Sequence, residues 1–184
     1  MESRRPSVGL KIKSNKKRYA LGESIFVDVM IENLSSEEIK IRRYLLLPAD
    51  DPRNNIKFEV TDSNGQQIVI KSHTFTGREE VPLWEMVEKL KENQPFTQTF
   101  QLAGMYKSKV NNIPSTLEPL WSLGENPEES INEYPVQKAG SYQIIAIYRN
   151  LDSGSNWPKE YWDREQIVWT GELISNAISI DVLE

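Results

Sequence analysis

The chain has 184 residues, of which 38% are hydrophobic and 27% are charged, and its mean hydropathy is -0.55. These values are typical of one folded globular domain, and they argue against a disordered or a membrane-embedded chain. The formal net charge of -5 argues against nucleic acid as the main partner, because phosphate binding needs concentrated Lys and Arg. The absence of cysteine excludes thiol catalysis, disulfides and cysteine-ligated zinc. No apolar run approaches the length of a bilayer span, so we expect no transmembrane segment.

The N-terminal region is basic. Its cations are Arg4, Arg5, Lys11, Lys13, Lys16, Lys17 and Arg18. Such a patch would suit phosphate or an anionic membrane surface, but we favour an exposed first strand whose lysines discourage pairing with other chains.

The first residues carry charge and no apolar stretch, so we expect no signal peptide in them. If a leader was removed, the protein is periplasmic, displayed on the cell surface or secreted; otherwise it is cytoplasmic.

Alternating apolar residues predict strands in the first part of the chain. Residues 8–13 have the pattern of a half-buried first strand, and residues 25–32 have that of a second. The turn-forming residues at 33–38 precede a third strand at 39–43. We expect the second and third strands to pair as a hairpin.

The strongest hairpin signal surrounds Asp62-Ser63-Asn64-Gly65. Residues 56–60 alternate before it, and residues 67–70 return after it. Asn-Gly adopts positive φ with little steric cost, as a tight turn between two strands requires. We therefore predict an antiparallel pair joined at this point.

The middle of the chain changes character twice. From Val81 to Glu92 the apolar residues follow a helical period and Pro82 suits a first turn, so we predict one short amphipathic helix that caps an end of the domain. An alternating strand follows at 96–102. Residues 103–133 are interrupted by prolines and have no clear period, which predicts a long insertion packed on the domain.

Two runs rich in β-branched and aromatic residues close the chain, at 140–148 and 169–182. Each has a glycine near its start, and the second alternates strictly near its end, as the last strands of an all-β sandwich do. The whole chain, residues 1–184, is therefore predicted to be a single antiparallel β-sandwich domain with one short helix and a long loop insertion.

Both ends of the chain carry strand motifs found together in one family. Residues 19–25, Tyr-Ala-Leu-Gly-Glu-Ser-Ile, lead to Ile-Glu-Asn at 31–33, while Ala-Gly-Ser-Tyr at 139–142 is followed by Trp-Thr-Gly at 169–171. These motifs resemble the opening and closing strands of bacterial immunoglobulin-like modules, and the middle of the chain is not covered. The resemblance implies an immunoglobulin-like sandwich of about seven to nine strands. It implies little about activity, since one fold hosts many functions.

A narrower resemblance is to the bacterial intracellular proteinase-inhibitor family. The shared features are the Gly22-Glu23 opening, the Asp62–Gly65 hairpin and a late glycine-tyrosine strand. The insertion at 103–133 departs from the compact form of that family, and no inhibitory motif can be placed on particular residues. Proteinase inhibition is therefore kept as an alternative function.

The sequence contains no recognisable catalytic motif. His73 is the only histidine, and its neighbours do not form a nucleophile motif for a Ser-His-Asp arrangement. There is no histidine cluster for zinc, no phosphate-binding glycine loop and no dinucleotide fingerprint. Oxygen-rich stretches at 50–55 and 152–156 would suit calcium, but neither matches an EF-hand, and turn formation accounts for both. We predict no catalytic residue, no metal and no cofactor.

One segment combines aromatic and acidic side chains: Trp157, Glu160, Tyr161, Trp162 and Asp163. Aromatic residues in a loop between the last strands would stack on a sugar ring or anchor a protein partner. Glycoside hydrolysis also requires little more than two acids beside aromatic platforms. The competing interpretation is that both tryptophans fold back over the rim of the sandwich.

We therefore expect a non-catalytic binding or protein-interaction domain of a bacterial cell-envelope or secreted protein. Its partner would be a protein or a glycan, bound by the aromatic segment. The alternatives are a proteinase inhibitor and a carbohydrate-binding or carbohydrate-active protein. The sequence does not determine the oligomeric state.

Overall fold

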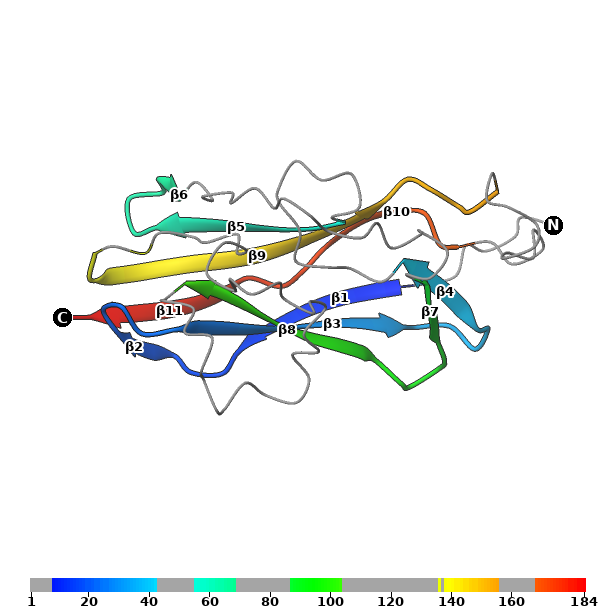
Figure 1. Ribbon diagram of the computed structural model, residues 1–184, viewed down its shortest axis with the longest axis horizontal. Helices are drawn as coiled ribbons and strands as arrows, with labels where there is room; N and C mark the ends of the chain where they lie inside the picture. Colours follow the sequence, from blue (N-terminus) through cyan, green and yellow to red (C-terminus); the bar gives the residue numbers. More distant parts are fainter. Residues whose placement is uncertain (1–7, 43–54, 69–86, 104–135, 137, 156–167) are drawn as a thin grey trace, which may run out of the picture.

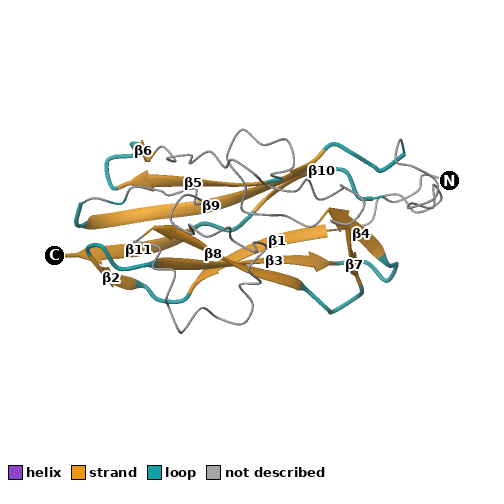
Figure 2. Ribbon diagram, in the orientation of Figure 1, coloured by secondary structure: helices purple, strands orange, loops and turns teal. Residues whose placement is uncertain are grey.

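The computed structural model describes residues 8–42, 55–68, 87–103, 136, 138–155 and 168–184. Every regular element in these ranges is a strand, so the fold is all-β, as predicted (Figures 1 and 2). The strands are, in chain order, β1 (Val8–Ser14), β2 (Arg18–Ala20), β3 (Ile25–Asn33), β4 (Ile39–Arg42), β5 (Ile56–Asp62), β6 (Gln67–Ile68), β7 (Val87–Leu90), β8 (Phe96–Ala103), β9 (Gly140–Asn150), β10 (Gly171–Ile174) and β11 (Ile178–Leu183).

Three antiparallel strands form the first sheet, in the order β1-β3-β8. Every second residue of β3 is buried, because side chains on a strand point alternately to its two faces. Within the described chain β1 lies at an edge of this sheet, and Lys11 and Lys13 are exposed on it. This position agrees with the predicted first strand whose lysines lie at an edge.

Six strands form the second sheet, in the order β2-β11-β9-β5-β6, with β10 also paired to β9. The pairs are antiparallel except for β2, which runs parallel to β11. Because β1 belongs to the first sheet and β2 to the second, the chain passes from one sheet to the other between Ser14 and Arg18. The predicted closing strands are both present, and the second is divided into β10 and β11.

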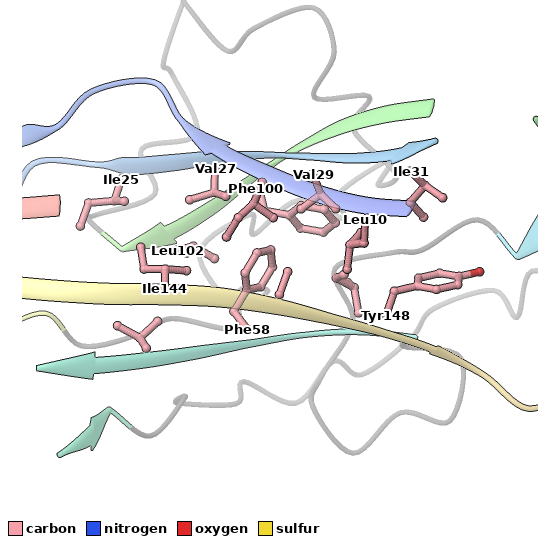
Figure 3. Packing of buried hydrophobic residues seen from close by; sticks show 14 of the residues in the cluster. Leu10, Ile25, Val27, Val29, Ile31, Phe58, Phe100, Leu102, Ile144 and Tyr148 are labelled. Carbon is pink, nitrogen blue, oxygen red and sulfur yellow. The ribbon is translucent and has the colours of Figure 1, made fainter. Parts of the chain in front are cut away.

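The two sheets face each other across one apolar core (Figure 3). Phe58 of β5 and Phe100 of β8 meet in this core edge to face, with ring centroids 5.4 Å apart. Ile144 of β9 and Val27 of β3, each at most 1% exposed, lie on opposite sides of the same layer. Burial of a large side chain contributes about 1.5–3 kcal/mol, so this facing arrangement is the main source of stability.

The helix predicted at 81–92 is wrong for residues 87–92, none of which is helical. Residues 87–90 form β7, which pairs antiparallel with β4, and residues 81–86 lie outside the described ranges. Val87 and Leu90 fit a helical stripe, but the pairing places Leu90 opposite Ile39, where both are buried. The partner strand is distant in sequence, and local periodicity carries no information about it.

The predicted pairing of the second and third strands is also wrong. β4 pairs with β7 and not with β3. The side chain of Asn33 explains how β3 ends: its Nδ2 donates to the carbonyl oxygens of Glu37 at 2.6 Å and Leu90 at 3.1 Å. The chain is thereby turned away from β3 toward β7.

The predicted hairpin around Asp62 is confirmed. β5 and β6 pair antiparallel with Val60 opposite Ile68. The Oδ1 atom of Asp62 accepts hydrogen bonds from the backbone N of Asn64 at 2.9 Å and of Gln66 at 2.8 Å. Gly65 has a φ of 77°, the left-handed conformation that glycine adopts most easily.

The predicted insertion lies outside the described residues from position 104 onward. In the ranges that are described, we find no helix with the length and apolar character needed to cross a membrane.

Candidate functional site

The predicted binding residues, Trp157, Glu160, Tyr161, Trp162 and Asp163, all lie outside the described residues. The structure does describe the chain on both sides of them, at 150–155 and at 168–170. We call the residues that join these two sides the loop base: Asn150, Asp152, Ser153, Val168 and Trp169. The loop base therefore contains the described residues between which the segment 156–167 lies in the chain.

Asn150 is the central residue of the loop base. It is the last residue of β9 and is only 1% exposed. Its Nδ2 donates to the carbonyl oxygen of Asp152 at 2.9 Å and to that of Trp169 at 2.7 Å, and its Oδ1 accepts from the backbone N of Asp152 at 3.2 Å. One buried amide therefore connects the outgoing and the returning chain.

Backbone hydrogen bonds close the loop base further. The N of Val168 donates to the carbonyl oxygen of Ser153 at 3.1 Å. The next residue, Trp169, donates its N to the carbonyl oxygen of Lys40 in β4 at 2.7 Å. The segment between Ser153 and Val168 thus has its two ends held together, as in the compact surface loops that often carry function.

The ring of Trp169 packs at the start of β10. Its centroid lies 6.0 Å from that of Tyr148, at an interplanar angle of 30°. A Cβ atom built on Gly171 would lie 2.7 Å from a carbon of the Trp169 ring, far closer than van der Waals contact. The absence of a side chain at Gly171 is therefore what allows the indole to pack so close to this residue.

Buried polar groups next to the loop base connect β9 to β4. The hydroxyl of Tyr148 donates to the carbonyl oxygen of Arg42 at 2.6 Å, and Nδ2 of Asn55 donates to the same oxygen at 3.1 Å. Burial raises the pKa of the Tyr148 hydroxyl well above its usual range, so this hydroxyl remains a donor. All four residues of β4 are buried, including Lys40, so the strand that accepts the Trp169 bond is covered on both faces.

One of the two oxygen-rich stretches considered for calcium belongs to this region. The Oδ1 atom of Asp152 accepts a hydrogen bond from the N of Gly154 at 2.9 Å, which is ordinary turn geometry. In the described part of the chain, no group of three or more His, Asp or Glu residues is placed to hold a metal ion. The other stretch lies outside the described residues except for Asn55, and His73 lies outside them as well.

Sequence reasoning identified the aromatic segment but not the residues that hold its ends. Asn150 and Asn55 look like ordinary polar residues at strand ends, and no local pattern marks them as buried. The one local signal at Asn150 is its residue type, because an asparagine side chain often bonds the backbone two residues ahead.

Comparison with known proteins gives little guidance. No protein-family model matches the chain, and no curated protein matches it. Among solved structures, the chain is similar to a beta-glucosidase from Listeria innocua in complex with gluconolactone, with 15% sequence identity and a TM-score of 0.39. The match covers 97% of this chain but only 16% of that enzyme. A likeness at this level carries no argument about the fold or activity of the present chain.

Proposed function

We propose that the protein is a non-catalytic binding module that presents the segment 156–167 to a protein or glycan partner. The observation that carries the proposal is the closed loop base, in which Asn150 and the Val168–Ser153 hydrogen bond hold the ends of that segment together. A binding loop gains affinity when its ends are fixed, because less conformational freedom is lost on association. The composition of the segment, with Trp157, Tyr161 and Trp162, suits a contact surface.

We further propose that the sandwich is immunoglobulin-like. The strand order supports this, because such domains place their first two strands in one sheet with a later strand, and pair their last strands in the other. Here β1 and β3 lie with β8, while β5, β9 and β11 lie together opposite them. The parallel pairing of β2 with β11 fits a first strand that switches between the sheets.

Tyr142 adds a second supporting feature. It lies near the start of β9, is 5% exposed, and donates its hydroxyl to the carbonyl oxygen of Lys138 at 2.8 Å. A tyrosine at this place whose hydroxyl returns to the backbone just upstream is typical of immunoglobulin-like domains. In such domains the loops at the ends of the sandwich are the usual binding sites, and the described chain that leads to the segment 156–167 begins where β9 ends, at Asn150.

The test compares the double variant Trp157→Ala/Trp162→Ala with wild type. A matched control, Leu21→Ala/Leu183→Ala, removes two apolar side chains elsewhere in the chain, which are 46% and 50% exposed. These two residues lie side by side, since the N of Leu21 donates to the carbonyl oxygen of Leu183 at 2.8 Å. All three proteins are first shown to have closely similar unfolding midpoints.

Two readouts are run in parallel, a glycan array and affinity capture from cells of the source organism followed by mass spectrometry. We expect one class of ligand to be retained by wild type and by the control and to be lost with the tryptophan variant. A ligand retained equally by all three proteins would contradict the proposal. Stoichiometric inhibition of a protease by wild type, lost in the tryptophan variant, would identify the partner as a protease.

A further inference from the structure

The outer face of the six-stranded sheet carries an apolar patch that the core does not use. Ile145 and Ile147 alternate along β9 with the buried residues Ile144, Ala146 and Tyr148, so they point away from the first sheet. Ile174 of β10 lies directly opposite Ile147 and is 62% exposed. We call Ile145, Ile147 and Ile174 the isoleucine patch.

Opposite charges border the patch on β5. Lys57 lies opposite Ile147 and Glu59 lies opposite Ile145, and their side chains form an ion pair of 3.0 Å. Both side chains point outward, because they alternate with buried residues of β5, and they are 58% and 33% exposed. Two neighbouring rows across the sheet therefore read Lys57-Ile147-Ile174 and Glu59-Ile145.

This pattern is self-complementary. A two-fold axis that runs across the strands, midway between the two rows, superimposes each row on the other row of a second copy. Lys57 then faces the second copy's Glu59, and Ile147 faces the second copy's Ile145. Such an arrangement uses the same surface on both copies, as the interface of a two-fold dimer must.

The next rows agree with the same axis. Arg149 and Glu172 form the row beyond Ile147, with an ion-pair distance of 3.8 Å, and Gln143 and Ser179 form the row beyond Ile145. The axis places the first pair against the second copy's Gln143 and Ser179. No like charges are opposed among these positions, and opposed like charges are the usual reason why a charged face rejects its own copy.

We propose that this face, centred on the isoleucine patch, is a homodimer interface in which Lys57 and Glu59 pair between the two copies. The patch is small, which predicts a weak, reversible dimer rather than an obligate one. The residues assigned to this interface do not include those of the loop base.

The experiment is sedimentation velocity of the full chain, from low micromolar to several hundred micromolar concentrations. Wild type is expected to shift from monomer to dimer across this range. Ile174→Asp is expected to stay monomeric, because it places a carboxylate within the isoleucine patch. The matched control Leu34→Asp changes a residue of similar exposure, 60%, in the turn after β3, and is expected to dimerise like wild type.

Charge exchange tests the geometry itself. Lys57→Glu and Glu59→Lys each oppose like charges across the axis and are expected to weaken the dimer about tenfold or more. The double variant Lys57→Glu/Glu59→Lys restores opposite charges and is expected to dimerise like wild type. A wild type that stays monomeric throughout, or an Ile174→Asp variant that dimerises normally, overturns the proposal. A double variant no better than the single ones overturns the proposed pairing. Circular dichroism of each variant verifies that it is folded.

Discussion

The turn between β5 and β6 and the loop base both return the chain into the same sheet, but they are built differently. In the turn, Asp62 bonds the backbone of residues two and four positions ahead. In the loop base, Asn150 reaches Trp169, and Trp169 reaches Lys40, so the partners come from three distant parts of the chain. The turn can form from local contacts, whereas the loop base forms only when β4, β9 and β10 have assembled. The geometry of the loop base therefore depends on the assembled fold, and that of the turn does not.

The largest loss of stability is expected from Asn150→Ala. The substitution removes both hydrogen bonds that Asn150 donates and the one that it accepts, all at a residue that is 1% exposed. Because buried polar groups lose their partners, we expect a loss of about 3 kcal/mol in the free energy of unfolding, measured by urea denaturation. Asp62→Ala, which removes two exposed hydrogen bonds at the turn, is expected to cost only about 1 kcal/mol. Equal losses in the two variants would remove the distinction between the two regions.

A smaller loss of stability is expected from Gly171→Ala. The variant Gly65→Ala makes the same change in the turn and is compared with it. The new Cβ at position 171 would meet the Trp169 ring at 2.7 Å, whereas at position 65 nothing lies within 4 Å. We expect a loss of about 2 kcal/mol at Gly171, where the clash adds to a positive φ of 152°, and of about 1 kcal/mol at Gly65, where the φ of 77° acts alone. Tryptophan fluorescence should change only in the Gly171 variant. An unchanged emission spectrum there would show that the indole does not pack as described.

The smallest effect at neutral pH is expected from Tyr148→Phe. The carbonyl oxygen of Arg42 keeps Asn55 as a donor, so the loss should be about 1 kcal/mol. The pH dependence of stability tests the burial of Tyr148 more directly than the loss at neutral pH. Burial raises the pKa of Tyr148, so above pH about 10 the unfolded chain releases this proton while the folded chain retains it. Stability is therefore complete below that pH and falls as the pH rises further.

Urea midpoints of wild type and Tyr148→Phe, compared from neutral pH to about pH 11, check this expectation. The variant should lose less stability across that range. Part of the alkaline loss should remain, because burial also raises the pKa of Tyr19. Identical pH profiles would mean that the Tyr148 hydroxyl is not buried in solution.

The same contrast between local and distant contacts explains what the sequence could predict. The alternation in β3 and β9 and the Asn-Gly turn are local signals, and the structure has strands and a turn at these places. The segment at 87–90 was assigned to a helix, since Val87 and Leu90 satisfy a helical period as well as they satisfy the strand that pairs with β4. The choice depends on a partner more than forty residues earlier in the chain.

The residues of the candidate site also differ in whether local sequence or distant contacts mark them. The aromatic residues from Trp157 to Trp162 are predicted from composition alone, because Trp and Tyr are concentrated there beside acids, and their role stays a prediction. Composition did not identify Asn150, whose importance follows from burial and from the distant chain that it contacts. The pairing of Lys57 with Ile147 is likewise a matter of register, which no single strand reveals.

Binding by the segment 156–167 is tested most directly by an equilibrium titration of the ligand recovered in the capture or array experiment against wild type and Trp157→Ala/Trp162→Ala. We predict an affinity at least about tenfold weaker for the variant, corresponding to about 1.4 kcal/mol, with an unfolding midpoint close to that of wild type. Equal affinities of the two folded proteins would contradict the assignment of binding to this segment.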